Sequence, residues 1–232
     1  MKRYEKDMDY SYTLGIFPTI ELLNRKIIAV SKIIFSSEIN KDIENKIIEL
    51  CNNKIEYTYD DKLIKKISDK ENCYVIGIFN KYYSNLDLNE PHVVLVNPSN
   101  MGNVGTIIRT MLGFNYKNLA IITPSVDIFN PKVIRASMGS IFGVSIKLFS
   151  SFDEYKETYN KHKIYTFMTD GKLKLNEIEK DNLVSLVFGN ESSGLDESYK
   201  KYESVVINHS NEIDSLNLTI AIGISLYEFS LK

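Results

Sequence analysis

The most constraining feature of this sequence is a series of short apolar runs between residues 92 and 207. The six runs consist mainly of Val, Ile, Leu and Phe, and helical patterns lie between them. They are His92–Val96, Asn118–Thr123, Val144–Phe149, Ile164–Met168, Leu183–Phe188 and Ser204–Ile207. A strand that is apolar along its whole length is covered on both faces, as in a parallel sheet between layers of helices. We therefore predict a parallel α/β sheet here.

The first 80 or so residues also alternate helices and strands, in shorter runs. The predicted helices are Pro18–Val30, Asn40–Asn52 and Asp61–Ile67, and the predicted strands are Lys32–Ser36, Ile55–Tyr59 and Cys73–Phe79. The segment Asn80–Pro91 is polar and has no clear period, which indicates a linker. We therefore predict two domains, a small α/β module at residues 1–88 and a larger α/β domain at residues 89–232.

Charge and composition exclude some classes of protein. The net charge of −2 and the pI near 6.0 argue against a general nucleic-acid coat, so any RNA contact requires a local basic patch. The N-terminus lacks the apolar core of a secretory signal, and no apolar run approaches the roughly 20 residues of a membrane span. Neither the cysteines nor the histidines show metal-ligand spacing. We predict a cytoplasmic protein without a metal or a membrane partner.

The first motif is Asn97–Phe114, NPSNMGNVGTIIRTMLGF, which follows a predicted strand and runs into a helix. Gly102 and Gly105 permit a tight turn and close backbone approach to a ligand. Asn103 lies at the turn, and Arg109 lies six residues later on the helix. The spacing is G-x-x-G rather than the G-x-G-x-x-G of dinucleotide sites, and no acidic ribose ligand follows about 20 residues later. This argues against a dinucleotide-binding site.

The second motif is Leu183–Leu195, LVSLVFGNESSGL, in which an apolar strand ends at Phe188 and opens into a polar turn. Parallel α/β proteins bind ligands at the carboxyl ends of their strands, so this turn is a candidate ligand site. An ordinary turn with a helix-capping serine and a surface Glu191 explains the same residues equally well. This motif alone does not decide between the two.

The third motif is Ser215–Phe229, SLNLTIAIGISLYEF, which predicts a buried C-terminal helix. We expect Ser215 to cap this helix. Asn217 is an amide among apolar neighbours and therefore needs a partner, which is either structural or functional.

Together the three motifs, in this order and spacing over roughly Val93–Glu228, resemble the SpoU family of the SPOUT (α/β-knot) methyltransferases. The resemblance implies a Rossmann-like parallel sheet whose C-terminal segment, about Ser185–Phe229, threads a loop as a deep trefoil knot. Such a knot is an exception to the rule that chains are unknotted. The resemblance also implies S-adenosylmethionine as methyl donor, RNA as substrate, and a homodimer with the knots packed together.

Family roles carry over by position. Asn103 and Arg109 match the first-motif residues, Glu191 matches the second-motif acid, and Ser215 and Asn217 match the third-motif pair. These five are the predicted catalytic residues. The resemblance also implies that the cofactor lies against residues whose backbone atoms hold it in the knot, namely Gly189, Asn190, Ile207 and Leu216.

Two further segments bear on the resemblance. Ile207-Asn208-His209 stands where family members often have Ile-Pro-Met, which is a departure in the cofactor loop. Arg135–Gly139 looks like a family helix that lies close to the first motif. In the N-terminal part, Tyr12–Leu23 is similar to the family's ribosomal-protein-like module for substrate binding. Lys62, Lys65 and Lys66 share a helical face there, which suits either an RNA phosphate contact or simple solvation.

The leading hypothesis is therefore a ribose 2′-O-methyltransferase acting on RNA, on ribosomal rather than transfer RNA. Because a guanidinium hardly ever loses its proton, we expect Arg109 to bind a phosphate and stabilise negative charge on the ribose oxygen. Asn103, Glu191 and Asn217 would orient Arg109 and the ribose. Two alternatives remain open at this point, a knotted enzyme that methylates a base and an inactive knotted RNA-binding or assembly factor.

Overall fold

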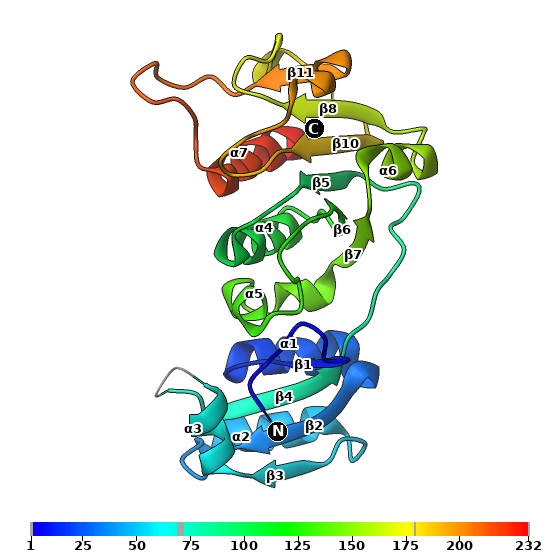
Figure 1. Cartoon of the computed structure of the whole chain (residues 1–232). Coiled ribbons are helices and arrows are strands. Elements are labelled where there is room, and N and C mark those ends of the chain that lie inside the picture. Colours follow the sequence, from blue (N-terminus) through cyan, green and yellow to red (C-terminus); the bar gives the residue numbers. More distant parts are fainter. Residues whose placement is uncertain (1, 69–71, 179, 232) are drawn as a thin grey trace. The chain divides into compact units, whose positions relative to one another are not determined.

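The computed structural model describes residues 2–68, 72–178 and 180–231 (Figure 1). The chain forms two compact units, Met1–Tyr82 with Asp127–Gly143, and Tyr83–Val126 with Val144–Lys232. A single division at residue 88 therefore misplaces the segment 127–143, which belongs with the first unit. Its contacts explain why: Ser11 Oγ donates to the carbonyl oxygen of Phe129 at 2.5 Å, and the Phe129 ring lies 6.1 Å from that of Phe79.

The first unit contains a four-stranded sheet in the order β1-β4-β2-β3, in which β1 and β2 run antiparallel to β4 and β3 runs parallel to β2. Its strands are β1 (Tyr10–Tyr12), β2 (Val30–Phe35), β3 (Tyr57–Tyr59) and β4 (Val75–Asn80). Its helices are α1 (Ile16–Lys26), α2 (Lys41–Cys51), α3 (Asp61–Ile67) and α5 (Pro131–Ala136), with short 3₁₀ turns at Ile27–Ala29 and Ser140–Gly143.

Local capping sets where these helices begin. Asn40 accepts backbone hydrogen bonds from Asp42 and Ile43 and so starts α2, while Asp60 accepts from Leu63 and starts α3 as predicted. The helix α1 ends at Lys26, earlier than predicted, because a 3₁₀ turn and then β2 follow it. The short strand β1 was not predicted.

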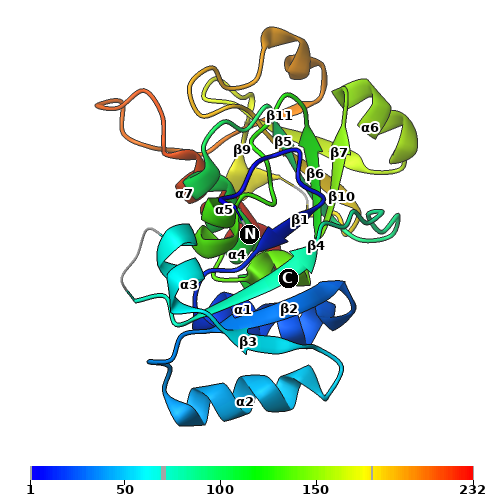
Figure 2. The same ribbon diagram turned by 60° about the horizontal axis from the view of Figure 1, so that its bottom comes forward.

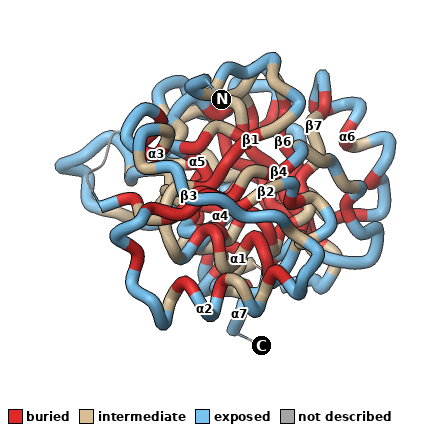
Figure 3. The backbone as a smooth tube through the Cα atoms, turned by 90° about the horizontal axis from the view of Figure 1, so that it is seen from below, coloured by how far each residue is buried: buried red, intermediate tan, exposed pale blue. Residues whose placement is uncertain are grey.

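Helices cover both faces of the first sheet. On one face α1 and α2 pack together (Figure 2). On the other, Ile64 and Ile67 of α3 join a buried cluster with Ile34 and Ile76. The buried stretches of the backbone follow strands such as β1 and β4 (Figure 3), so the apolar core of this unit lies against its sheet.

The second unit contains a seven-stranded sheet in the order β7-β6-β5-β10-β8-β11-β9, and every neighbouring pair is parallel. Its strands are β5 (His92–Val96), β6 (Asn118–Ile122), β7 (Ser145–Phe149), β8 (Lys163–Phe167), β9 (Leu173–Lys174), β10 (Val184–Phe188) and β11 (Glu203–Val206). The six predicted apolar strands and the parallel sheet are confirmed. All residues of β5, β6 and β10 are buried, which explains their continuous apolar sequence.

The helices of this unit are α4 (Met101–Gly113), α6 (Phe152–Thr158) and α7 (Leu218–Ser230), with 3₁₀ turns at Leu175–Glu177 and Glu197–Lys201. The side chain of Asn100 accepts a hydrogen bond from the backbone of Asn103 and starts α4. One face of α4 is fully buried and packs against neighbours that include α7. Its residues follow the helical spacing i, i+3, i+4 and i+7 and are Val104, Ile107, Ile108 and Met111. In the part of the chain that the structure describes, no helix is long and apolar enough to cross a membrane.

Candidate functional site

A cavity of about 320 Å³ lies at the carboxyl ends of β8, β10 and β11, all in the second unit. Strand ends supply one part of its wall, and the start of α7 with the segment before it supplies another. The lining includes Phe167, Met168, Phe188, Gly189, Asn190, Glu191, Val205, Ile207, Ser215, Leu216, Leu218 and Ala221. This edge is where parallel α/β sheets bind ligands.

The wall of this cavity is built around a close backbone approach. A Cβ atom on Gly189 would lie 2.1 Å from the carbonyl carbon of Gly194, so only glycine fits at this position. The rings of Phe167 and Phe188 stack nearby, with centroids 4.3 Å apart and planes 12° apart. Aromatic side chains and a turn of exposed backbone therefore meet at the cavity.

Asn190 lines the cavity, but its side chain is used within the protein. Its Nδ2 donates to the carbonyl oxygen of Asn97 at 2.7 Å, and its Oδ1 accepts from the backbone and hydroxyl of Ser192 at 2.9 and 2.8 Å. The amide thus shapes the turn after β10 and joins it to the end of β5.

Glu191 joins the same turn to the segment that starts α4. Its Oε2 accepts hydrogen bonds from the backbone and hydroxyl of Ser99 at 3.0 and 2.9 Å. Its Oε1 accepts from the backbone of Asn100 at 3.1 Å and from Nδ2 of Asn103 at 3.4 Å. Burial raises the pKa of the Glu191 carboxyl, but these hydrogen bonds outweigh it and leave the pKa below the usual range. The group is therefore an anion fixed at a helix N-terminus.

Asn103 and Arg109 lie in different surroundings on α4. Asn103 contacts Glu191, as described. Arg109 is exposed, and its guanidinium makes no hydrogen bond or ion pair with any residue that the structure describes. Neither residue lines the cavity. The structure therefore brings Asn103 and Glu191 together, whereas Arg109 has no side-chain partner among the residues that the structure describes.

The start of α7 differs from the sequence-based prediction. The helix begins at Leu218, and its cap is Asn217, whose Oδ1 accepts from the backbone and hydroxyl of Thr219 at 2.9 and 2.7 Å. The expectation that Ser215 caps this helix is wrong, because Asn217 is the residue next to the first turn and is a preferred cap. Asn217 thus has a structural partner. Ser215, Leu216 and Ile207 line the cavity.

Sequence reasoning missed some residues of the cavity. Met168 and Thr169 line it just after β8, and the end of that predicted strand was a usable signal for them. His209 also lines it, and its place in the segment Ile207–His209, matched to the family's cofactor loop, was a usable signal. Asp214 lines it from the irregular segment between β11 and α7, and no pattern there points to this residue. Among the residues described, no three His, Cys, Asp or Glu side chains are grouped to hold a metal ion.

Comparisons with known proteins agree with this architecture. The model of the SpoU rRNA Methylase family matches residues 90–227. An uncharacterised tRNA/rRNA methyltransferase of Synechocystis is 29% identical over 140 residues, which are 59% of this chain and 51% of the relative. A 23S rRNA (adenosine(1067)-2′-O)-methyltransferase of Streptomyces azureus is 26% identical over 141 residues, 59% of this chain and 52% of that protein. The chain thus matches only about half the length of these two relatives.

Solved structures are similar over most of the chain. The AdoMet-bound rRNA methyltransferase from Sinorhizobium meliloti has a TM-score of 0.80 at 24% identity, covering 95% of this chain and 87% of that one. The SpoU methyltransferase AviRb from Streptomyces viridochromogenes has a TM-score of 0.82 at 18% identity, covering 96% and 89%. At these identities the likeness concerns the fold. The match of the family model over more than half of the residues goes further: the chain belongs to the SpoU rRNA methylase family.

Proposed function

We propose that this chain transfers a methyl group from S-adenosylmethionine to a ribose 2′-hydroxyl of RNA, on ribosomal rather than transfer RNA. The observation that carries the proposal is the cavity at the carboxyl ends of β8, β10 and β11, inside the segment that the family model matches. The relatives support the chemistry, because they include both a 23S rRNA (adenosine(1067)-2′-O)-methyltransferase and a tRNA (cytidine-2′-O-)-methyltransferase.

The residues of the cavity fit this methyl donor. Its volume of about 320 Å³ lies in the range of small-molecule sites. Phe188, Leu216 and Leu218 offer apolar surface to an adenine ring, and the turn at Gly189 offers backbone groups to polar atoms. Glu191 and Asp214 place carboxylates where a ligand with a sulfonium and an ammonium group carries positive charge.

The chain's own residues then have separate roles. The bound donor supplies a methyl group on a positively charged sulfur. Arg109, an exposed cation without a partner among the residues described, holds the phosphate beside the target ribose and stabilises negative charge on the 2′-oxygen as the hydroxyl proton passes to water. Glu191 and Asn103 fix the start of α4, and this helix in turn positions Arg109. Much of the rate comes from this positioning.

We also propose that about Ser185–Phe229 forms the trefoil knot of the family. One close backbone approach supports it: a Cβ on Gly171 would lie only 2.4 Å from the carbonyl carbon of Val205, which is inside this segment. Segments that pass this closely need glycine at the crossing.

The exposed face of α7 supports a homodimer. Three apolar side chains recur on it at i, i+4 and i+7 and are exposed by 54, 39 and 54%: Ile220, Ile224 and Tyr227. Such a stripe on a helix is typical of a surface that packs against a partner. We propose that a second copy covers it, with the active site near the interface. A protein that sediments as a monomer at micromolar concentration would contradict this.

The remaining predictions concern the rest of the chain. We propose that the module at residues 1–88 binds the RNA substrate, that the protein is cytoplasmic, and that it needs no metal. Lys62 and Lys65 are exposed on α3, so they are available to contact phosphate.

The test is methyl transfer to total RNA from radiolabelled S-adenosylmethionine, followed by alkaline hydrolysis. A 2′-O-methyl product protects its linkage from alkali, whereas a base methyl does not. Arg109→Ala should lower the rate by about 100-fold or more while calorimetry shows unchanged donor binding. Arg25→Ala removes an exposed arginine of the first unit and serves as the control. Transfer by Arg109→Ala at near wild-type rate would refute the role given to Arg109.

A further inference from the structure

Three aromatic rings form a cluster at the open edge of the first sheet. Within the part of the chain that the structure describes, the strand β3 pairs only with β2, and all three of its residues are exposed. Phe35 is fully buried, and its ring centroid lies 5.7 Å from that of Tyr57 and 5.8 Å from that of Tyr59. The two tyrosines are 42 and 50% exposed. Two half-exposed rings therefore rest on a buried one.

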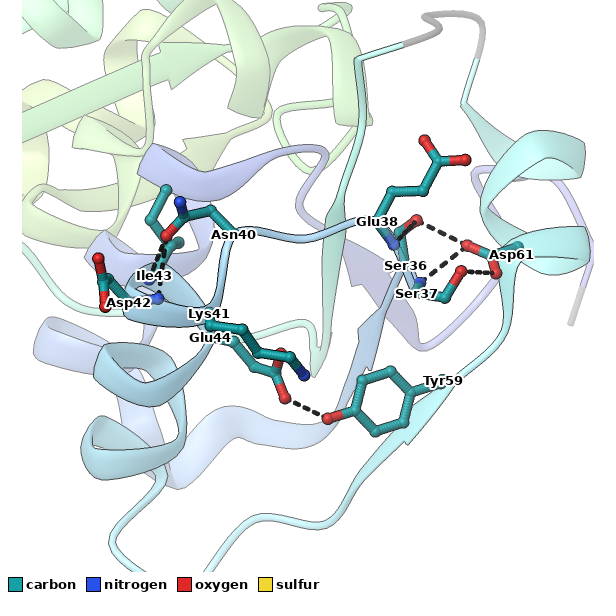
Figure 4. Close-up of polar contacts among 10 residues, drawn as sticks. All are labelled: Ser36, Ser37, Glu38, Asn40, Lys41, Asp42, Ile43, Glu44, Tyr59 and Asp61. Carbon is teal, nitrogen blue, oxygen red and sulfur yellow. Dashed lines mark hydrogen bonds and ion pairs between the residues drawn. The ribbon is translucent and has the colours of Figure 1, made fainter.

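The Tyr59 ring is held in place from α2. Glu44 is only 4% exposed, and one of its oxygens accepts a hydrogen bond from the Tyr59 hydroxyl (Figure 4). Its other oxygen lies 2.8 Å from Nζ of Lys41. Hydrogen bonds from Lys41 and Tyr59 hold the pKa of Glu44 below its ordinary value, so the group is an anion. Burying a carboxylate costs free energy, and here it fixes the orientation of a half-exposed ring.

Lys41 adds an accessible positive charge beside this ring. Its side chain is 76% exposed, and its Nζ lies 6.0 Å from the centroid of the Tyr59 ring. An ammonium has three donors, so the contact with Glu44 leaves donors for a second anion. An exposed aromatic ring beside a lysine that keeps donors for a second anion matches a ligand that has a π-system linked to a negative charge.

We propose that Tyr57, Tyr59 and Lys41 form a site for an unpaired nucleotide of RNA, with the base stacked on the Tyr59 ring, the Tyr57 ring standing at 85° to that ring and bounding the site, and a phosphate on Lys41. The proposal rests on the proposed function in taking RNA as the ligand. A base within a duplex is already stacked between its neighbours, so the site selects single-stranded segments, loops or bulges.

The charge around the site predicts how binding responds to salt. The exposed carboxylates Glu38, Asp42 and Glu56 lie close in sequence to the three residues and offset nearby lysines. Stacking rather than phosphate charge therefore supplies most of the affinity. With one phosphate contact on a single strand, the logarithm of the binding constant should fall with that of salt with a slope of about −0.7.

The experiment uses the full chain and a fluorescein-labelled oligouridine single strand, followed by anisotropy. Tyr59→Ala should weaken binding by about tenfold or more, the usual effect of removing a stacking ring. Tyr57→Ala removes the ring that stands at 85° to Tyr59 and should weaken binding by a smaller factor, about threefold. Tyr59→Phe keeps the ring and the fold, loses the bond to Glu44, and should weaken binding by only about two- to fivefold. Leu173→Ala, at an exposed apolar side chain of the second unit, should bind as wild type does.

Three outcomes would overturn the proposal: alanine variants that bind within twofold of wild type, equal binding of a duplex of the same length, or no binding of oligouridine up to about 1 mM, above the range of nonspecific affinities. Donor binding, measured by calorimetry on the same variants, separates this result from the proposed function. A wild-type chain that does not bind S-adenosylmethionine contradicts the proposed function, whereas unaffected RNA binding by Tyr59→Ala contradicts only the stacking site.

Discussion

The two ends of the second sheet hold polar clusters of opposite character. At the carboxyl ends, Glu191 binds exposed loop segments and lies beside an open cavity. At the amino ends, His92 and His162 are buried with Tyr155 and Ser185. His92 Nδ1 lies 2.9 Å from the Tyr155 hydroxyl, which lies 2.5 Å from Ser185 Oγ, which lies 3.0 Å from His162 Nδ1. The amino end thus forms a closed network, whereas the carboxyl end keeps a cavity for a ligand.

The difference shows how one sheet separates stability from binding. Side chains of the buried network bond one another across β5, β10 and α6 and so hold the sheet, although Nε2 of His162 is buried without a hydrogen-bond partner among the residues described. At the carboxyl end the fixed side chains hold turns, and the turns present backbone to the cavity. Substitutions in the network at the amino end should therefore change mainly stability, whereas substitutions at the carboxyl end should also change donor binding.

The largest effect is expected at Gly189. A Cβ there would overlap the backbone of Gly194, so Gly189→Ala should destabilise the fold by about 4 kcal/mol and abolish donor binding. Gly194 has a φ of +66° but nothing within 4 Å of an added Cβ, so Gly194→Ala should cost only about 1 kcal/mol. Urea unfolding measures both. Equal losses in the two variants would show that backbone overlap is not what excludes a side chain at Gly189.

The buried network should make stability fall in mild acid. Burial lowers the pKa of His92 from its ordinary 6.5 to about 4, and burial also lowers the pKa of His162. In the unfolded chain the His92 imidazole binds a proton as the pH falls through 6.5, whereas in the folded chain it does so only near pH 4. Stability is therefore complete above pH 6.5 and is lost as the pH falls towards 4, by about 3 kcal/mol for His92 alone.

Urea unfolding at several pH values measures this slope. His92→Phe removes the titrating group, so it should lower stability at pH 7 and flatten the pH dependence. His209→Ala, in the irregular segment at the opposite end of the sheet, should leave the pH dependence unchanged. A wild-type protein equally stable at pH 7 and pH 5 would mean that the network is open to water.

The two ends of the second sheet also show which parts of the structure the sequence could predict. The strands β5, β6 and β10 were predictable because they are buried on both faces and so read as continuous apolar runs. The turn after β10 was placed correctly because it follows such a run. The bond from Ser99 to Glu191 was not predictable, because it joins residues 92 apart through the folding of two loops. The packing of Phe129 with the first unit is non-local in the same way.

A smaller effect is expected when Glu191 loses its charge. Glu191→Gln replaces one of two accepting oxygens by a donor, so the bonds from Ser99 or Asn100 weaken, and stability should fall by about 2 kcal/mol. The wild-type carboxyl has a lowered pKa, so its contribution is present above pH 4.5 and lost as the pH falls below that value. Glu197→Gln, at a carboxylate that is 81% exposed, is the control and should change stability by less than about 0.5 kcal/mol. If Glu191→Gln and Glu197→Gln lost similar amounts of stability, the proposal that Glu191 holds the two loops together would be contradicted.

The smallest effect separates two neighbours before α7. Asn217→Ala removes the side chain that caps the helix and should cost about 1 kcal/mol. Ser215→Ala should cost less than about 0.5 kcal/mol, because this exposed residue lies outside the helix and lines the cavity. Donor binding should weaken more in Ser215→Ala than in Asn217→Ala, since of these two residues only Ser215 lines the cavity. Urea unfolding measures the loss of stability in both variants, and calorimetry measures the loss of donor binding. If Ser215→Ala were the more destabilising change, the helix would begin earlier than Leu218, and the cavity would lose part of its wall.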